Sequence, residues 1–150
     1  QGDGHAALGL PAPLTSTVRD TVRRYEDAER PVRLQADELP LALPDLAVHR
    51  ALANLIDNAL AYGRGPVDVE LRAVAGGAEL RVAEAGPGMS PAEFERAQQP
   101  FVRLTRARSE LGHCGLGLAI VAQVARQLGA RLRCERDAAG RFAIVLALPG

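Results

Sequence analysis

Two asparagines one helical turn apart are the residues of this chain best placed to do chemistry. Asn54 and Asn58 lie in a segment, His49 to Gly63, that is otherwise patterned as a buried helix. At roughly 100° per residue the two amides share one helix face, beside the apolar stripe and not opposite it. Asparagine is a mediocre helix former because its amide competes for backbone hydrogen bonds. The pair therefore indicates either a binding site or, alternatively, two amides that bond each other or water.

Glycines next to a strand end and a helix start mark two further candidate segments. Glu84-Ala-Gly86-Pro-Gly88 follows a predicted strand, and its glycines allow a ligand close to the backbone and to the Glu84 carboxylate. Gly115-Leu-Gly117 runs into an apolar helix, whose unpaired N–H groups form a natural phosphate site. A tight turn would also explain the first segment, and a glycine loop alone is a weak indication of phosphate binding.

A basic stretch lies between these two segments. Phe101 is followed by Arg103, Arg106 and Arg108 in a region without periodicity. The stretch is either a solvated loop or a lid that brings positive charge to phosphates.

Composition limits the classes of protein to which the chain can belong. Its 150 residues, 47% of them hydrophobic, suffice for one domain with a sizeable core. Eighteen basic and 18 acidic residues cancel, which argues against a general nucleic-acid or anionic-membrane binder. No apolar run approaches the roughly 20 residues that span a bilayer, so we expect a cytoplasmic fragment without membrane insertion. Cys114 and Cys134 are isolated and indicate neither zinc nor a disulfide.

The expected elements fit a helical layer on a mixed sheet. Residues 1–13 are interpreted as a linker, and residues 14–150 as one domain. About three main helices and five strands are predicted, the strands mostly in hairpins, which favours an α/β two-layer sandwich over a doubly wound fold. The predicted helices span 15–29, 45–62, 91–99 (short) and 116–128, and the predicted strands span 32–36, 67–74, 78–82, 131–136 and 142–148.

Taken together and in order, these four segments resemble the N, G1, F and G2 boxes of the ATP-binding domain of sensor histidine kinases, a superfamily shared with DNA gyrase, MutL and heat-shock chaperone ATPases. The likeness runs from about Leu14 to Pro149, and the osmosensor-type kinases are most similar through Pro100-Phe-Val-Arg103. The resemblance implies the Bergerat fold, with about three helices on one face of a mixed five-stranded sheet.

The resemblance also implies roles for the N-box residues and for the lid. Asn58 matches the Mg²⁺ ligand, and Asn54 stands where related ATPases carry a water-activating Glu. Tyr62 matches the aromatic residue that covers adenine, and Arg103 matches a phosphate contact. Because an amide cannot be a general base, phosphoryl transfer is favoured over hydrolysis.

The glycine boxes complete the expected ATP site. Gly86, Gly88 and Phe101 join it from the G1 and F boxes, and backbone N–H groups of Gly115, Leu116, Gly117 and Leu118 would surround the phosphates. Three positions depart from the family pattern. Glu84 replaces the Asp that receives the adenine amino group, Ala61 replaces a basic residue, and His113 replaces a glycine, followed by Cys114 in place of Thr or Ser.

The expected cofactors are ATP and Mg²⁺, and the expected partners lie outside the chain. None of His5, His49 and His113 matches the family's phosphoacceptor, which sits on a dimeric helical domain of the same kinase. The resemblance also implies a response regulator downstream and a parent protein in the inner membrane. One alternative is a regulatory module of the same fold that has lost nucleotide binding; another, a gyrase-like ATPase, is disfavoured by Asn54.

Overall fold

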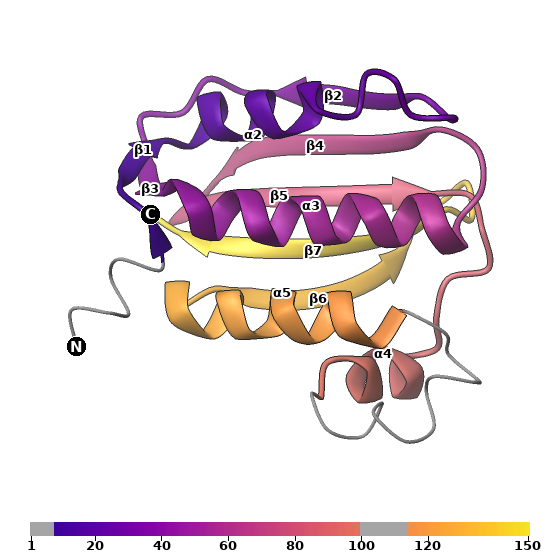
Figure 1. Ribbon diagram of the computed structural model, residues 1–150. Helices are drawn as coiled ribbons and strands as arrows, with labels where there is room; N and C mark the ends of the chain where they lie inside the picture. Colours follow the sequence, from indigo (N-terminus) through magenta and orange to yellow (C-terminus); the bar gives the residue numbers. More distant parts are fainter. Residues whose placement is uncertain (1–7, 100–113) are drawn as a thin grey trace.

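The computed structural model describes residues 8–99 and 114–150 as a sheet covered by helices on one face (Figure 1). The five-stranded sheet has the order β2-β4-β5-β7-β6, in which β2 and β4 are parallel and all other neighbours antiparallel. Its strands are β2 (Val32–Ala36), β4 (Val67–Val74), β5 (Gly77–Glu84), β6 (Arg131–Arg136) and β7 (Phe142–Pro149). The predicted mixed α/β sandwich is confirmed.

Four helices pack on this sheet in the described part of the chain. They are α2 (Leu14–Arg23), α3 (Asp45–Tyr62), α4 (Pro91–Ala97) and α5 (Cys114–Leu128). Helices α2, α3 and α5 run side by side over one face, and the short α4 packs beside the start of α5 (Figure 1). None of these helices is long and apolar enough to cross a membrane.

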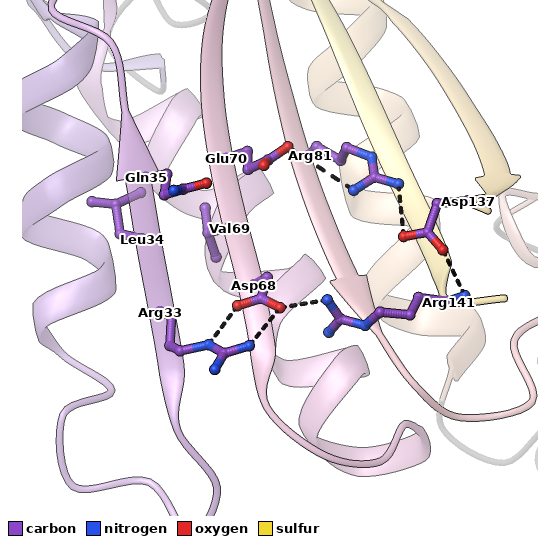
Figure 2. A pocket seen from close by; sticks show the side chains of 9 residues that line it. All are labelled: Arg33, Leu34, Gln35, Asp68, Val69, Glu70, Arg81, Asp137 and Arg141. Carbon is purple, nitrogen blue, oxygen red and sulfur yellow. Dashed lines mark hydrogen bonds and ion pairs between the residues drawn. The ribbon is translucent and has the colours of Figure 1, made fainter. Parts of the chain in front are cut away.

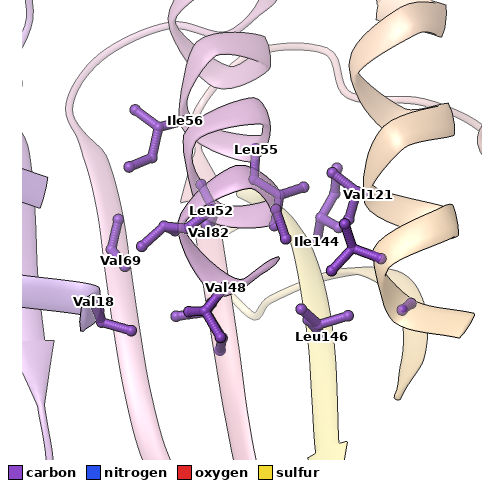
Figure 3. Close-up of a cluster of buried hydrophobic side chains, with 14 of the residues drawn as sticks. Val18, Val48, Leu52, Leu55, Ile56, Val69, Val82, Val121, Ile144 and Leu146 are labelled. Atoms are coloured by element: carbon purple, nitrogen blue, oxygen red, sulfur yellow. The ribbon is translucent and has the colours of Figure 1, made fainter. Parts of the chain in front are cut away.

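The core lies between this helical layer and the inner face of the sheet (Figure 3). Leu52, Leu55 and Ile56 of α3 are at most 1% exposed, as the helical periodicity predicts. Inward-facing residues of the strands meet them, because successive side chains of a strand point to opposite faces. Those labelled in Figure 3 are Val69, Val82, Ile144 and Leu146.

The outer face of the sheet carries ion pairs in place of helices (Figure 2). Arg33 donates two hydrogen bonds to Asp68, at 2.6 and 2.9 Å, and Arg141 donates a third to the same carboxylate. Arg81 bonds Glu135 at 3.2 Å and lies 3.7 Å from Asp137. This outer ion-pair network, comprising these six residues, allows one sheet face to remain open to water.

Three local predictions differ from the structure. Helix α2 ends at Arg23 instead of Glu29, because the next N–H groups bond carbonyls three residues back and so tighten the chain into turns. Part of the predicted linker forms β1 (Pro11–Pro13), which pairs with β3 (Ala42–Pro44), a strand that was not predicted. Helix α5 begins at Cys114, so the glycine segment is its first turn and not a loop before it.

Candidate functional site

Asn54 and Asn58 face the first turn of α5, where a glycine makes room for them. A Cβ atom on Gly117 would lie 3.0 Å from Oδ1 and 3.2 Å from Nδ2 of Asn58, and 3.4 Å from Oδ1 of Asn54. Both ends of the Asn58 amide therefore lie against Gly117. The Nδ2 atom of Asn58 is buried and has no hydrogen-bond partner within residues 8–99 and 114–150. Such a group costs roughly 1–3 kcal/mol of folding free energy unless a ligand satisfies it.

The neighbouring residues on α3 are satisfied within the protein. Asn54 donates from Nδ2 to the Arg50 carbonyl at 2.7 Å, one turn earlier, so its oxygen is the end that faces Gly117. Asp57 points away from the site and accepts a hydrogen bond from the Tyr25 hydroxyl at 2.9 Å. Burial of the Tyr25 phenol, together with this bond, raises its pKa. Of these three neighbouring side chains on α3, Asn58 is thus the one with a buried donor that has no partner among the described residues.

A second part of the site lies where β5 ends beside the end of α3. Glu84 is 6% exposed, and its Oε1 accepts a hydrogen bond from the N–H of Gly86. A Cβ atom on Gly63 would lie 2.4 Å from this oxygen, and one on Gly86 would lie 2.7 Å from the Gly63 Cα. Two glycines therefore clamp the carboxylate that was expected to contact adenine.

The loop after β5 is fixed by contacts on both sides. Gly88 has a φ of +68°, and a Cβ there would lie 2.5 Å from the Phe142 ring. The carbonyl of Pro87 accepts a hydrogen bond from Arg136. Ser90 then caps α4 through a reciprocal pair of bonds with Glu93, at 2.8 and 3.1 Å. The glycine at position 88 is thus needed for packing against Phe142, whether or not a ligand also approaches it.

The start of α5 offers backbone N–H groups to a ligand. Gly115, Leu116, Gly117 and Leu118 lie near this helix start, and the N–H groups of its first turn have no partner within the helix. Leu118 is 0% exposed, so its side chain belongs to the core. An anion between this helix start and Asn58 would meet N–H donors from both sides.

The structure thus brings part of the predicted site together. Asn54 and Asn58 meet the start of α5, and Glu84 and Gly86 meet the C-terminal end of α3, where the partly exposed Tyr62 also lies. Other predicted residues lie outside the described residues: Phe101, Arg103, Arg106, Arg108 and His113. Ala61 is exposed, in keeping with a position that usually carries a basic side chain.

Two contributors could not be foreseen from the sequence. Gly63 was expected only to stop α3, although its missing Cβ is what admits the Glu84 carboxylate. Arg30 donates to three carbonyls at that helix end, those of Ala59, Leu60 and Gly63. Close glycine spacing gives a hint of the first residue. No local sequence pattern indicates the role of Arg30, because the carbonyls that it bonds lie about 30 residues away in the sequence.

Comparison with known proteins assigns the family. Residues 44–150 match the family described as histidine kinase-, DNA gyrase B-, and HSP90-like ATPase. The sensor protein RstB of Escherichia coli is 39% identical over 100 residues, which make up 66% of this chain and 23% of that protein. The chain therefore spans about a quarter of the length of this curated relative.

Solved structures agree with the sequence matches. The mycobacterial sensor histidine kinase MprB is 28% identical with a TM-score of 0.77, over 95% of this chain and 97% of that one. The histidine kinase domain of the E. coli osmosensor EnvZ is 29% identical with a TM-score of 0.67, over 93% and 87% of the two chains. This chain belongs to the histidine kinase-, gyrase B- and HSP90-like ATPase family, as an ATP-binding catalytic domain of the sensor histidine kinase type.

Proposed function

We propose that this domain binds Mg²⁺-ATP between α3, the end of β5 and the start of α5. It then transfers the γ-phosphoryl group to a histidine on a helical dimerisation domain of the same kinase. In this arrangement Glu84 and Tyr62 contact the adenine, and the start of α5 contacts the phosphates. Arg103, two residues after Phe101 in the sequence, adds positive charge from the segment that precedes α5.

The buried amide of Asn58 is the observation that carries this proposal. Its Nδ2 donor has no partner in the described part of the chain, and Gly117 lets the start of α5 approach the same amide. A phosphate oxygen supplies the missing acceptor. A buried donor that only a ligand can satisfy is expected at a binding site and is costly elsewhere.

The residues also fit a magnesium ion. Mg²⁺ takes oxygen ligands in an octahedral shell, keeps several waters and is commonly held by substrate phosphates plus one or two protein oxygens. Asn58 can supply one such oxygen. Within the described residues there is no cluster of three or more His, Cys, Asp or Glu side chains, so phosphate oxygens and water would complete the shell. When bound, the ion would neutralise phosphate charge during transfer.

Asn54 favours transfer to a protein acceptor over hydrolysis. A neutral amide cannot remove a proton from water, so no general base stands at this position. Its nitrogen is held by the Arg50 carbonyl, which leaves its oxygen to orient groups near the phosphates. We accordingly expect little steady ATP turnover by the isolated domain.

The role of this domain within a longer kinase is proposed from its relatives. RstB is named a sensor protein, and the chain spans 23% of it, so we place the phosphoacceptor domain elsewhere in the parent kinase. We further propose a response regulator as the downstream phosphate acceptor and an inner-membrane location for the parent. No nucleic-acid partner is proposed, because the net charge is zero.

Calorimetric titration with a non-hydrolysable ATP analogue and Mg²⁺ tests this function. The wild type should bind, whereas Asn58→Ala should lose at least roughly a hundredfold in affinity, which is ~2.7 kcal/mol. Stability of the ligand-free variant should stay within about 1 kcal/mol, since the Nδ2 donor of Asn58 makes no hydrogen bond within the described residues.

Asp57→Ala is the matched control, because Asp57 is adjacent in the sequence but bonds Tyr25 on another face. It should keep nucleotide affinity. Absence of binding by the wild type at millimolar nucleotide would overturn the proposal in favour of a regulatory module without nucleotide. Unfolding of the Asn58→Ala variant would make the amide structural.

A further inference from the structure

The C-terminal end of α3 is held by a side chain from outside the helix. The last four carbonyls of a helix have no partner within it, and the helix dipole concentrates negative charge there. The last turn of α3 contains no basic residue. Arg30, in the connection between α2 and β2, supplies the missing charge from a distant part of the sequence.

The guanidinium of Arg30 spans three carbonyl groups at once. Nη1 donates to the Gly63 carbonyl at 2.8 Å, and Nη2 donates to those of Ala59 and Leu60 at 2.9 and 2.8 Å. A planar group with several fixed donors suits this task, whereas an ammonium group is a single point charge. Arg30 therefore fixes the position of Gly63 relative to the last turn of α3.

Gly63 is in turn the surface against which Glu84 rests. Its φ of −90° and ψ of −170° are open to any residue, so backbone freedom does not explain the glycine. Space does, because a Cβ there would lie 2.4 Å from Oε1 and 2.5 Å from the carboxyl carbon of Glu84. The next residue continues the contact, since Arg64 accepts a hydrogen bond from the N–H of Ala85 at 2.9 Å.

We infer that Arg30 is a positioning residue for base recognition, which acts through Gly63 on the Glu84 carboxylate. This inference rests on the proposed nucleotide function. A carboxylate accepts a hydrogen bond from the 6-amino group of adenine and repels the 6-oxo group of guanine. When Arg30 and Gly63 hold the Glu84 carboxylate in place, the site prefers ATP over GTP. When the carboxylate is free to move, this preference is weaker. Contacts to the triphosphate should change less, because Asn58 lies more than one turn before Gly63 and its side chain faces Gly117 of α5.

The experiment compares Mg²⁺-ATP, Mg²⁺-GTP and Mg²⁺-tripolyphosphate binding to the wild type and to Arg30→Met, Arg30→Lys and Arg24→Met. We expect Arg30→Met to lower the affinity ratio of ATP over GTP by roughly tenfold and to leave tripolyphosphate affinity unchanged. Arg30→Lys should recover part of the ratio. Arg24→Met, an exposed control at the end of α2, should keep the wild-type ratio.

Amide NMR signals of the ligand-free protein give a second measurement. Gly63 and Gly86 should shift in Arg30→Met but not in Arg24→Met, because only Arg30 bonds the Gly63 carbonyl. An unchanged ATP to GTP ratio with folded Arg30→Met would overturn the inference alone. Equal losses for all three ligands would make Arg30 a purely structural residue. A wild type that binds no ATP would overturn both the inference and the proposed function.

Discussion

On the outer face of the sheet charged side chains pair with one another, whereas on the side of α3 that faces α5 a buried polar group has no partner within the described residues. Asp68 accepts from both Arg33 and Arg141, and these bonds, that of Arg33 first, hold the pKa of its carboxyl below the usual range. The Nδ2 donor of Asn58 has no partner in the described residues.

The difference shows how a charged surface can be told from a binding site. Polar groups that complete each other's hydrogen bonds stabilise the fold and leave nothing for a ligand. An unpaired buried group costs stability in the free protein and regains it when a ligand binds. We therefore expect substitutions in the outer ion-pair network to lower stability without changing affinity, and substitutions around Asn58 to lower affinity without lowering stability by more than about 1 kcal/mol.

After Asn58→Ala, Gly117→Ala should have the largest effect, and the loss should appear in binding. Its Cβ would lie 3.0 Å from Asn58 Oδ1, so the amide must move by a few tenths of an ångström. We expect Mg²⁺-ATP affinity to fall by at least roughly tenfold, or ~1.4 kcal/mol. Stability of the free domain should stay level or rise by up to ~1 kcal/mol, because Ala is the better helix former.

Calorimetric titration measures the Mg²⁺-ATP affinity of Gly117→Ala, and thermal unfolding measures the stability of the same variant without ligand. Gln123→Ala, at an exposed position of the same helix, is the control for helix propensity and should keep full affinity. Unchanged ATP binding by Gly117→Ala would mean that the phosphates bind elsewhere. The unpaired amide of Asn58 would then not mark the binding site.

The sequence predicts the Asn54/Asn58 face well because it depends on one local period. The boundaries of β2, β4 and β6 were predicted for the same reason, since apolar and charged residues alternate within each strand. The start of α5 was placed two residues late, because Gly115 and Gly117 are poor helix formers and reduce the pattern there.

Contacts between distant segments could not be predicted in this way. The approach of Gly117 to Asn58 joins two helices, and the bonds from Arg30 join a connection to a helix end. Neither leaves a repeating pattern in the sequence. The family resemblance assigns Asn58 and Gly117 to one ATP site, because its motifs occur in a fixed order, but it does not predict their direct contact. It did not supply the bonds from Arg30, which lies outside those motifs.

Asp68→Ala should have a smaller effect, and only on stability. The substitution leaves Arg33 and Arg141 without their shared acceptor on a half-exposed surface, which we expect to cost about 1 kcal/mol. Urea unfolding measures this loss, and titration with Mg²⁺-ATP should show wild-type affinity. A weaker affinity would mean that changes on the outer face alter the proposed nucleotide site, contrary to the comparison.

The smallest expected effect is on the acid side of the stability curve. Because the folded-state pKa of Asp68 is lowered, its stabilising contribution is complete above the unfolded value of about 3.9 and is lost as pH falls through the folded value. Asp137 adds to the same window, since the Arg141 N–H lowers its pKa. Melting temperatures between about pH 6 and pH 2.5 should therefore fall less steeply in Asp68→Asn than in the wild type.

Asn58→Ala should follow the wild-type slope, because no titrating group is removed. Parallel curves for Asp68→Asn and wild type would show that the outer ion pairs add no stability, and the two regions would then differ only in whether their polar groups are paired.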